Sequence, residues 1–156
     1  RKAPDRLPKL IQAHREALAR ARAGLPKNTR VILVGKSMGA RVSCHVSLEE
    51  AVAAVVCLGY PLRGINGKLR DEVLAAMKTP VFFAQGTRDP LCPLPEMGRV
   101  MKRMKARSEL FVVEAGNHSL EITAARKKSR GLTQEAADRT ALTAVSHFLV
   151  SQACPS

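Results

Sequence analysis

A serine lies between two glycines at the end of a short apolar run. The segment Val31–Val34 is followed by Gly35, Ser37 and Gly39, so the sequence reads G-x-S-x-G. This spacing is typical of a strand that turns sharply into a helix and presents a serine at the turn. Side chains two residues either side of that serine would collide, which favours glycine at both positions. The pattern predicts a nucleophile at Ser37, with the backbone N–H of Met38 as a donor to the developing oxyanion.

A serine hydroxyl is a weak nucleophile unless a base accepts its proton and a carboxylate orients that base. Asp89 follows the third apolar run of the chain and His118 follows the fourth. The order Ser37, Asp89, His118 is the order in which this type of triad occurs along the chain. It predicts hydrolysis of a carboxylic ester or thioester through an acyl-enzyme on Ser37. Two alternatives stay open: Ser37 as a small residue in a tight turn, and Asp89 as a residue that shapes the turn before Pro90.

The elements that must position these residues alternate between strand and helix. This alternation predicts an α/β fold of about four parallel strands with flanking helices in a single domain, residues 1–156. The expected strands come from the apolar runs 31–34, 53–61, 80–90 and 109–119, and the expected helices are 7–23, the segment after Gly39, 71–77, 94–106 and 133–153. In open α/β sheets, sites lie beyond the carboxyl ends of the strands, where all three candidate residues fall.

Three further expectations concern burial and loops. The run 31–34 suits a strand that is buried on both faces. The last helix should place Leu142, Val145, Phe148 and Leu149 on one face, and residues 125–131 should form a loop.

The chain is strongly basic. Lysine and arginine number 26 against 13 acidic residues, a formal net charge of +13. Such an excess favours acidic partners. Nucleic acid is not favoured, because four Phe, one Tyr and no Trp leave few rings for base stacking. A membrane is not expected either, since no apolar run approaches the roughly 20 residues that span a bilayer.

The cysteines and histidines show no metal-ligand spacing, so neither a metal nor another cofactor is expected. Cys57 lies in an apolar run and should be a buried thiol. The chain is interpreted as reduced and intracellular, either cytoplasmic or nuclear. His14, His45 and His147 fall within expected helices and are interpreted as structural or solvated.

Three segments, 32–44, 83–93 and 115–121, resemble a family of α/β-hydrolase-like proteins. The family includes a small testis-expressed protein and the hydrolase-like part of a subunit of the NSL histone acetyltransferase complex, and it is more distantly similar to dienelactone hydrolases. The resemblance covers residues 1 to 150. It implies an α/β-hydrolase fold with Ser37, Asp89 and His118 in the triad positions. It implies no substrate, because the chemistry of the family is largely unassigned.

The sequence departs from this family in one respect. Family members begin with further strands, including a His-Gly loop that supplies a second oxyanion donor, and no H-G-x-G occurs in this sequence. The chain therefore resembles the C-terminal part of a family member. Residues 59–71, where larger relatives insert a lid, are too few for a lid domain. We expect residues 31–34 at an open sheet edge, and a chain that is poorly soluble or self-associating and at best weakly active. An upstream extension should restore both folding and reactivity toward a fluorophosphonate probe.

Two functions compete at this stage. One is a serine hydrolase that acts on a small-molecule acyl substrate. The alternative is a non-catalytic interaction module that keeps the fold and contacts an acidic or chromatin-associated protein partner. The three ordered residues favour the first, and the missing oxyanion segment favours the second.

Overall fold

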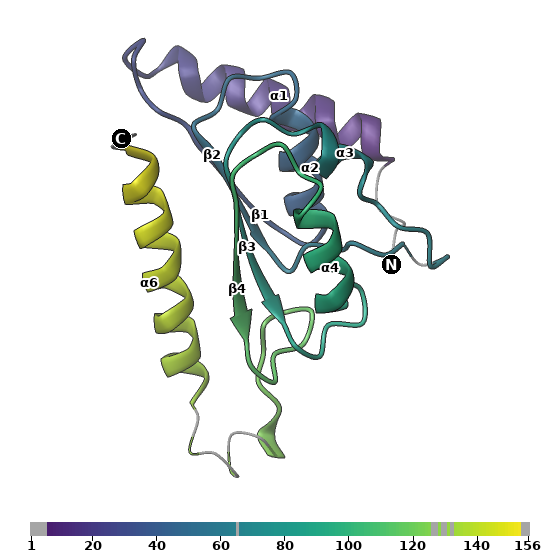
Figure 1. Cartoon of the computed structure of the whole chain (residues 1–156). Coiled ribbons are helices and arrows are strands. Elements are labelled where there is room, and N and C mark those ends of the chain that lie inside the picture. The colour runs from purple at the N-terminus through teal and green to yellow at the C-terminus, as the bar shows by residue number, and fades with distance from the viewer. Residues whose placement is uncertain (1–5, 65, 126–127, 129–130, 132, 154–156) are drawn as a thin grey trace.

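The computed structural model describes residues 6–64, 66–125, 128, 131 and 133–153. Its centre is a sheet of four parallel strands in the order β1-β2-β3-β4 (Figure 1). The strands are β1 (Ile32–Lys36), β2 (Ala54–Leu58), β3 (Val81–Gly86) and β4 (Ser108–Val113). The predicted α/β class with about four parallel strands is confirmed.

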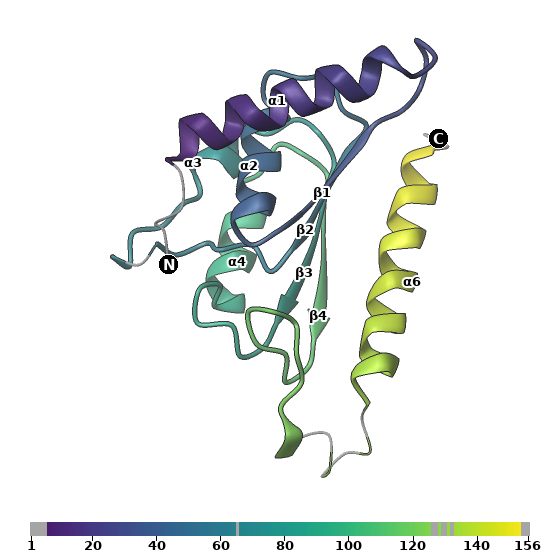
Figure 2. The ribbon, with the colours of Figure 1, turned by 180° about the vertical axis from the view of Figure 1, so that it is seen from behind.

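Helices cover the two faces of the sheet unequally. They are α1 (Leu7–Ala23), α2 (Met38–Val46), α3 (Glu72–Ala76), α4 (Leu94–Met101) and α6 (Gln134–Ala153). Of the five helices named here, α6 lies on one side of the sheet, whereas α2, α3 and α4 lie on the other, with α1 packed on α2 (Figures 1 and 2). In the described part of the chain, no helix is both long and apolar enough to cross a membrane.

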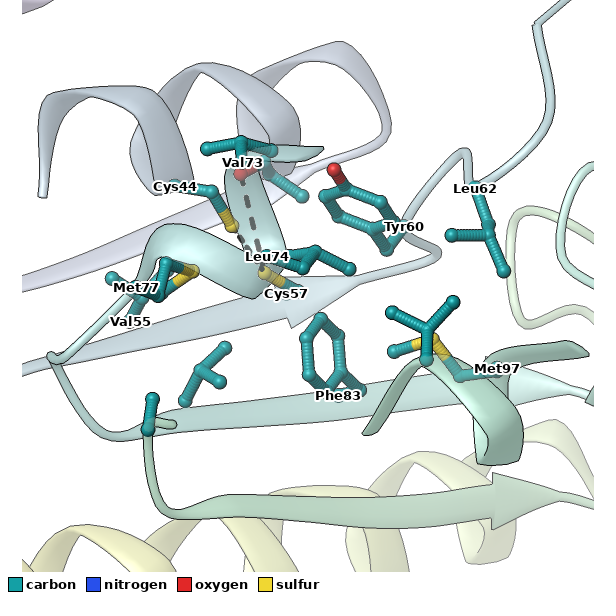
Figure 3. Packing of buried hydrophobic residues seen from close by; sticks show 14 of the residues in the cluster. Cys44, Val55, Cys57, Tyr60, Leu62, Val73, Leu74, Met77, Phe83 and Met97 are labelled. Atoms are coloured by element: carbon teal, nitrogen blue, oxygen red, sulfur yellow. Dashed lines mark hydrogen bonds between the residues drawn. The ribbon is translucent and has the colours of Figure 1, made fainter. Parts of the chain in front are cut away.

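The larger core lies under α2, α3 and α4. Tyr60 and Phe83 meet edge to face, with ring centroids 5.9 Å apart. Leu74 and Met77 close the same cluster (Figure 3). Cys57 is fully buried here, which confirms its assignment as a core thiol.

The smaller core lies under α6. Phe148 packs on Phe82 of β3, with ring centroids 5.5 Å apart, and Val145 and Leu149 flank it. The prediction that Leu142 shares this face is wrong, because its side chain is 67% exposed. Leu142 precedes Phe148 by six residues, which places it about 120° round the helix from the buried centre.

Two expected boundaries also change. The helix expected over 94–106 ends at Met101, because the chain turns there and sets Ala106 in the core at the entrance to β4. The loop expected over 125–131 falls mostly outside the described residues. Where the structure describes that segment, Ala125 and Lys128 are helical, so the loop assignment is wrong at these two residues.

Strand β1 lies at an edge of the sheet, as expected. The register pairs Ile32 with Ala54 and Val34 with Val56, so these two β1 side chains lie on the α6 face. Helix α6 packs on β2, β3 and β4, and Val34 is 63% exposed. The expectation that this strand is buried on both faces is therefore wrong. The strand also extends to Lys36, one charge that the apolar run did not include.

Residues 59–64 and 66–71 form a short loop without a lid domain, and contacts with the core and within the loop hold it in place. Tyr60 and Leu62 are fully buried, and an isolated antiparallel bridge joins Arg63 to Leu69. The loop is anchored to the core at its first residues.

The exposed β1 edge generates the first prediction. Bare strand edges with apolar side chains promote pairing between chains. We predict that the 156-residue chain self-associates with increasing concentration, and that Val34→Lys shifts it toward monomer in analytical ultracentrifugation. Leu142→Lys is the matched control, since that leucine is equally exposed but lies on α6. An equal effect of both substitutions would show that the edge is not responsible.

Candidate active site

Ser37 occupies a strained turn between β1 and α2. Its φ is 53° and its ψ is −116°, a region that residues other than glycine seldom adopt. The turn is held by two hydrogen bonds: Ser37 N–H donates to Leu58 O at 3.0 Å, and Arg41 N–H donates to Ser37 O at 3.2 Å. Strain of this kind costs about 1–3 kcal/mol and is concentrated at functional sites.

The two glycines of the motif have different roles. A Cβ on Gly35 would lie 2.4 Å from the backbone of Gly39 and Ala40, so the turn requires glycine there. A Cβ on Gly39 would meet nothing within 4 Å. The expectation that both glycines prevent a collision is therefore correct for Gly35 and wrong for Gly39, which faces open space.

Asp89 follows β3 and is buried, with 4% of its surface exposed. Its Oδ1 accepts a hydrogen bond from the backbone N–H of Leu91 at 2.8 Å, and its Oδ2 lies 2.8 Å from Nδ1 of His118. The carboxylate therefore shapes its own turn with one oxygen and contacts the imidazole with the other. The two interpretations of Asp89 that the sequence left open both hold geometrically.

His118 lies in the loop after β4, and its ring joins the other two residues. Its Nε2 is 2.8 Å from Ser37 Oγ, and its Nδ1 is 2.8 Å from Asp89 Oδ2. An ionised carboxylate only accepts hydrogen bonds, so Nδ1 carries the proton and Nε2 accepts from the serine hydroxyl. The structure thus brings together the three residues whose order along the sequence suggested a triad.

Backbone contacts that the sequence did not reveal hold the His118 loop in place. A Cβ on Gly86 would lie 2.1 Å from Gly116 O, and one on Gly59 would lie 2.4 Å from His118 O. Both glycines let the loops after β2 and β3 approach the histidine loop closely. Their only signal in the sequence was a glycine at the end of each apolar run.

Two side chains complete the support of this loop. Thr87 Oγ1 accepts a hydrogen bond from Ala115 N–H at 2.8 Å, which ties the Asp89 loop to the His118 loop. Asn117 Oδ1 accepts from the N–H groups of Ser119 and Glu121 at 2.8 and 3.0 Å. Sequence analysis did not single out either residue. The asparagine beside His118 was the available signal, since short amides often bond to nearby backbone.

The buried thiols do not compete with Ser37 as nucleophiles. Burial raises the pKa of Cys57, and a hydrogen bond with Cys44 adds to the rise. Burial, together with the negative charge of Asp89, raises the pKa of Cys92 to about 12. Both thiols are therefore protonated at neutral pH, and the thiolate is the reactive form.

The other histidines lie away from the hydrogen-bonded set of Ser37, His118 and Asp89, which we call the relay. His14 is on α1, where its Nδ1 is 3.0 Å from Leu10 O. His147 is on α6. His45 is on α2 with a buried Nε2 that has no hydrogen-bond partner in the described structure. Burial and then the nearby Arg41 charge lower the pKa of His45, so its ring is neutral at pH 7.

Comparison with known proteins identifies the class. The family described as "Alpha/beta hydrolase domain" matches residues 1–150, and the chain belongs to that family. This agrees with the four-stranded parallel sheet and with the predicted α/β-hydrolase fold.

Solved structures share the fold at low sequence identity. An alpha-beta serine hydrolase homologue from Coxiella burnetii is 17% identical with a TM-score of 0.66, over 90% of this chain and 62% of that one. Est1E from Butyrivibrio proteoclasticus is 15% identical with a TM-score of 0.60, over 91% and 72% of the two chains. The esterase domain of a Rhodothermus marinus protein is 14% identical with a TM-score of 0.57, over 71% and 61%. The present chain therefore spans less than two thirds of the Coxiella protein and of the Rhodothermus domain.

The difference in the space around Gly35 and Gly39 gives a prediction for a pair of variants. Gly35→Ala should destabilise the fold by about 1–3 kcal/mol, because a backbone would have to move to admit the methyl group. Gly39→Ala should be neutral or stabilising by up to about 1 kcal/mol, because it lies in a helix with space around it. Thermal unfolding measures both, since 1 kcal/mol corresponds to roughly 2–4 °C in a chain of this size. Equal losses in the two variants would contradict the geometry.

Proposed function

We propose that this protein is a serine hydrolase that cleaves a carboxylic ester or thioester, with Ser37 as nucleophile, His118 as base and Asp89 as orienting carboxylate. The observation that carries the proposal is the position of the imidazole, with one nitrogen 2.8 Å from the hydroxyl and the other 2.8 Å from the carboxylate. These are the contacts that a general base needs with its nucleophile and with its orienting group.

The proposed reaction has two halves. Ser37 Oγ attacks the acyl carbon while its proton moves to Nε2 of His118. The tetrahedral intermediate then collapses, and Nε2 gives that proton to the departing alcohol or thiol, which leaves the acyl group on Ser37. A water molecule, deprotonated by the same nitrogen, then attacks the acyl-Ser37 ester. The second tetrahedral intermediate collapses, Nε2 returns the proton to Ser37 Oγ, and the free acid leaves. Asp89 stays ionised throughout and stabilises the imidazolium.

The N-terminus of α2 supports the charged intermediate. Met38 is the first residue of the helix, and the first N–H groups of a helix have no acceptor within it. We propose the N–H of Met38 as a donor to the oxyanion, aided by the partial positive charge at this end of α2.

An interaction module remains the second candidate. The net charge of +13 favours an acidic protein partner. The resemblance to the testis-expressed protein and the NSL-complex subunit would then imply a role within a chromatin-associated assembly. A non-catalytic module has no need of a connected serine, histidine and aspartate, however, so the intact relay favours the hydrolase.

Ester hydrolysis by a serine variant distinguishes the two. With p-nitrophenyl acetate as substrate, Ser37→Ala should lower kcat by about 10⁴ to 10⁶ relative to the unmodified chain. Ser43→Ala is the matched control, because Ser43 lies on the same helix, is buried and takes no part in the relay. Hydrolysis that persists in Ser37→Ala, or falls equally in both variants, would refute Ser37 as the nucleophile.

A further inference from the structure

A second feature of the carboxyl edge is a pocket lined mainly by cations. It has a volume of about 240 Å³ and opens between α2, α3 and the loop that joins β2 to α3. The residues that line it are Arg41, Asn66, Lys68, Leu69, Arg70 and Glu72. Three positive side chains thus face one negative side chain.

The cations of this pocket have no acidic partner. Among the described residues, the ion pairs include none from Arg41, Lys68 or Arg70. Arg41 Nε is buried and has no hydrogen-bond partner there. Glu72 is exposed in the first turn of α3 and pairs with none of the three. Arg41 as a whole is half-buried, and a buried nitrogen without an acceptor is costly, which points to a ligand that is absent from the protein itself.

A neighbouring pocket shows the contrast. On the other side of the same loop, Arg63 pairs with Glu96, and Arg103 pairs with Asp71 at 2.7 Å. Two of the arginines in that pocket are therefore paired with carboxylates. In the described structure, Arg41 and Arg70 stay without an ion pair although Glu72 lines their pocket, which is a local property rather than a consequence of the overall charge.

The electrostatics of Arg41 agree with this geometry. Burial lowers its pKa, and the positive charge of Arg70 lowers it further. Two guanidinium groups are thus held close together with a repulsion that a bound anion would remove.

The pocket and the Ser37 turn share helix α2. Arg41 lies four residues after Ser37, about 6 Å along the axis of α2 and near the same face of the helix. Gly59 touches the His118 loop, and the next residue, Tyr60, donates its hydroxyl hydrogen bond to Arg70 O at 3.1 Å. A single small molecule could therefore place one group at Ser37 and another in the pocket.

We propose that the pocket formed by Arg41, Lys68 and Arg70 binds an anionic group, a carboxylate or a phosphate, carried by the acyl substrate of Ser37. The planar guanidinium groups suit two parallel hydrogen bonds to such an oxyanion. This inference rests on the proposed hydrolase function and narrows its substrate class to anionic esters or thioesters.

The first arm of the test measures binding without catalysis. Inorganic phosphate and succinate are titrated separately into the Ser37→Ala chain, with NMR shifts of the arginine side chains as the readout. Arg70→Gln should weaken binding by at least about tenfold, as expected for a charged hydrogen bond. Glu72→Gln should strengthen it, because the one negative side chain of the pocket is removed. Lys105→Gln, which removes an exposed charge outside the pocket, should change nothing.

The second arm measures selectivity. The quantity is the ratio of kcat/KM for mono-p-nitrophenyl succinate to that for p-nitrophenyl acetate. The p-nitrophenyl carboxylic ester of phosphonoacetate, whose phosphonate stands in for a phosphate, is the other anionic substrate. Arg70→Gln should lower this ratio by about tenfold and Lys68→Gln by less, since Lys68 is exposed. Lys105→Gln should leave it unchanged. A larger loss for one anionic ester identifies carboxylate or phosphate as the preferred group.

Three other outcomes would each contradict one part of the proposal: the anion site, its link to the substrate, or the hydrolase function. Anion binding that is equal in Arg70→Gln and Lys105→Gln would overturn the site. Binding that depends on Arg70 with an unchanged selectivity ratio would overturn the link to the substrate. Anion binding together with a complete lack of ester hydrolysis would refute the hydrolase function, and the assignment of a substrate group with it, while leaving an anion site. Lys68→Gln and Glu72→Gln alter exposed side chains, so they keep the test decisive even where an arginine variant fails to fold.

Discussion

The His118 ring has to lie within hydrogen-bond distance of a hydroxyl and of a carboxylate at the same time, and the rest of the fold satisfies that requirement. His118 lies 2.8 Å from a hydroxyl on one loop and 2.8 Å from a carboxylate on another. These groups follow β1, β3 and β4, so they meet only because the strands are parallel and all end at the same edge. The strained Ser37 turn and the close approach at Gly35, Gly59 and Gly86 then set the three loops to within a hydrogen bond of each other.

The same edge holds charges that the relay does not use. Glu96 and Asp71 each form an ion pair with an arginine. In the described structure, Arg41 and Arg70 form none. The proposed nucleophile, with a cationic pocket on the same helix, would suit substrates that carry their own negative charge. In this proposal, some of the basic residues of the chain bind an anionic group at this edge, in addition to any general attraction to acidic surfaces.

Local patterns predicted most of this arrangement. The G-x-S-x-G turn, the order of Ser37, Asp89 and His118, and the alternation of strands and helices depend on short-range chemistry that is visible in the sequence. Features that depend on packing between distant segments were not predictable. The register exposes Val34 because of what lies beside β1, and the rotation of α6 exposes Leu142 because Phe148 occupies the centre of its face. The open space around Gly39 and the proximity of the like charges on Arg41 and Arg70 also depend on neighbours far along the chain.

The central claim is that His118 and Asp89 activate Ser37, and the most direct test is to locate a covalent adduct. The chain is treated with a fluorophosphonate, and the modified residue is mapped by tandem mass spectrometry in the unmodified protein, in His118→Ala and in Asp89→Asn. The account predicts an adduct on Ser37 in the unmodified protein, little or none in His118→Ala, and slower formation in Asp89→Asn. An adduct on a different residue, or equal modification of Ser37 in all three proteins, would contradict it.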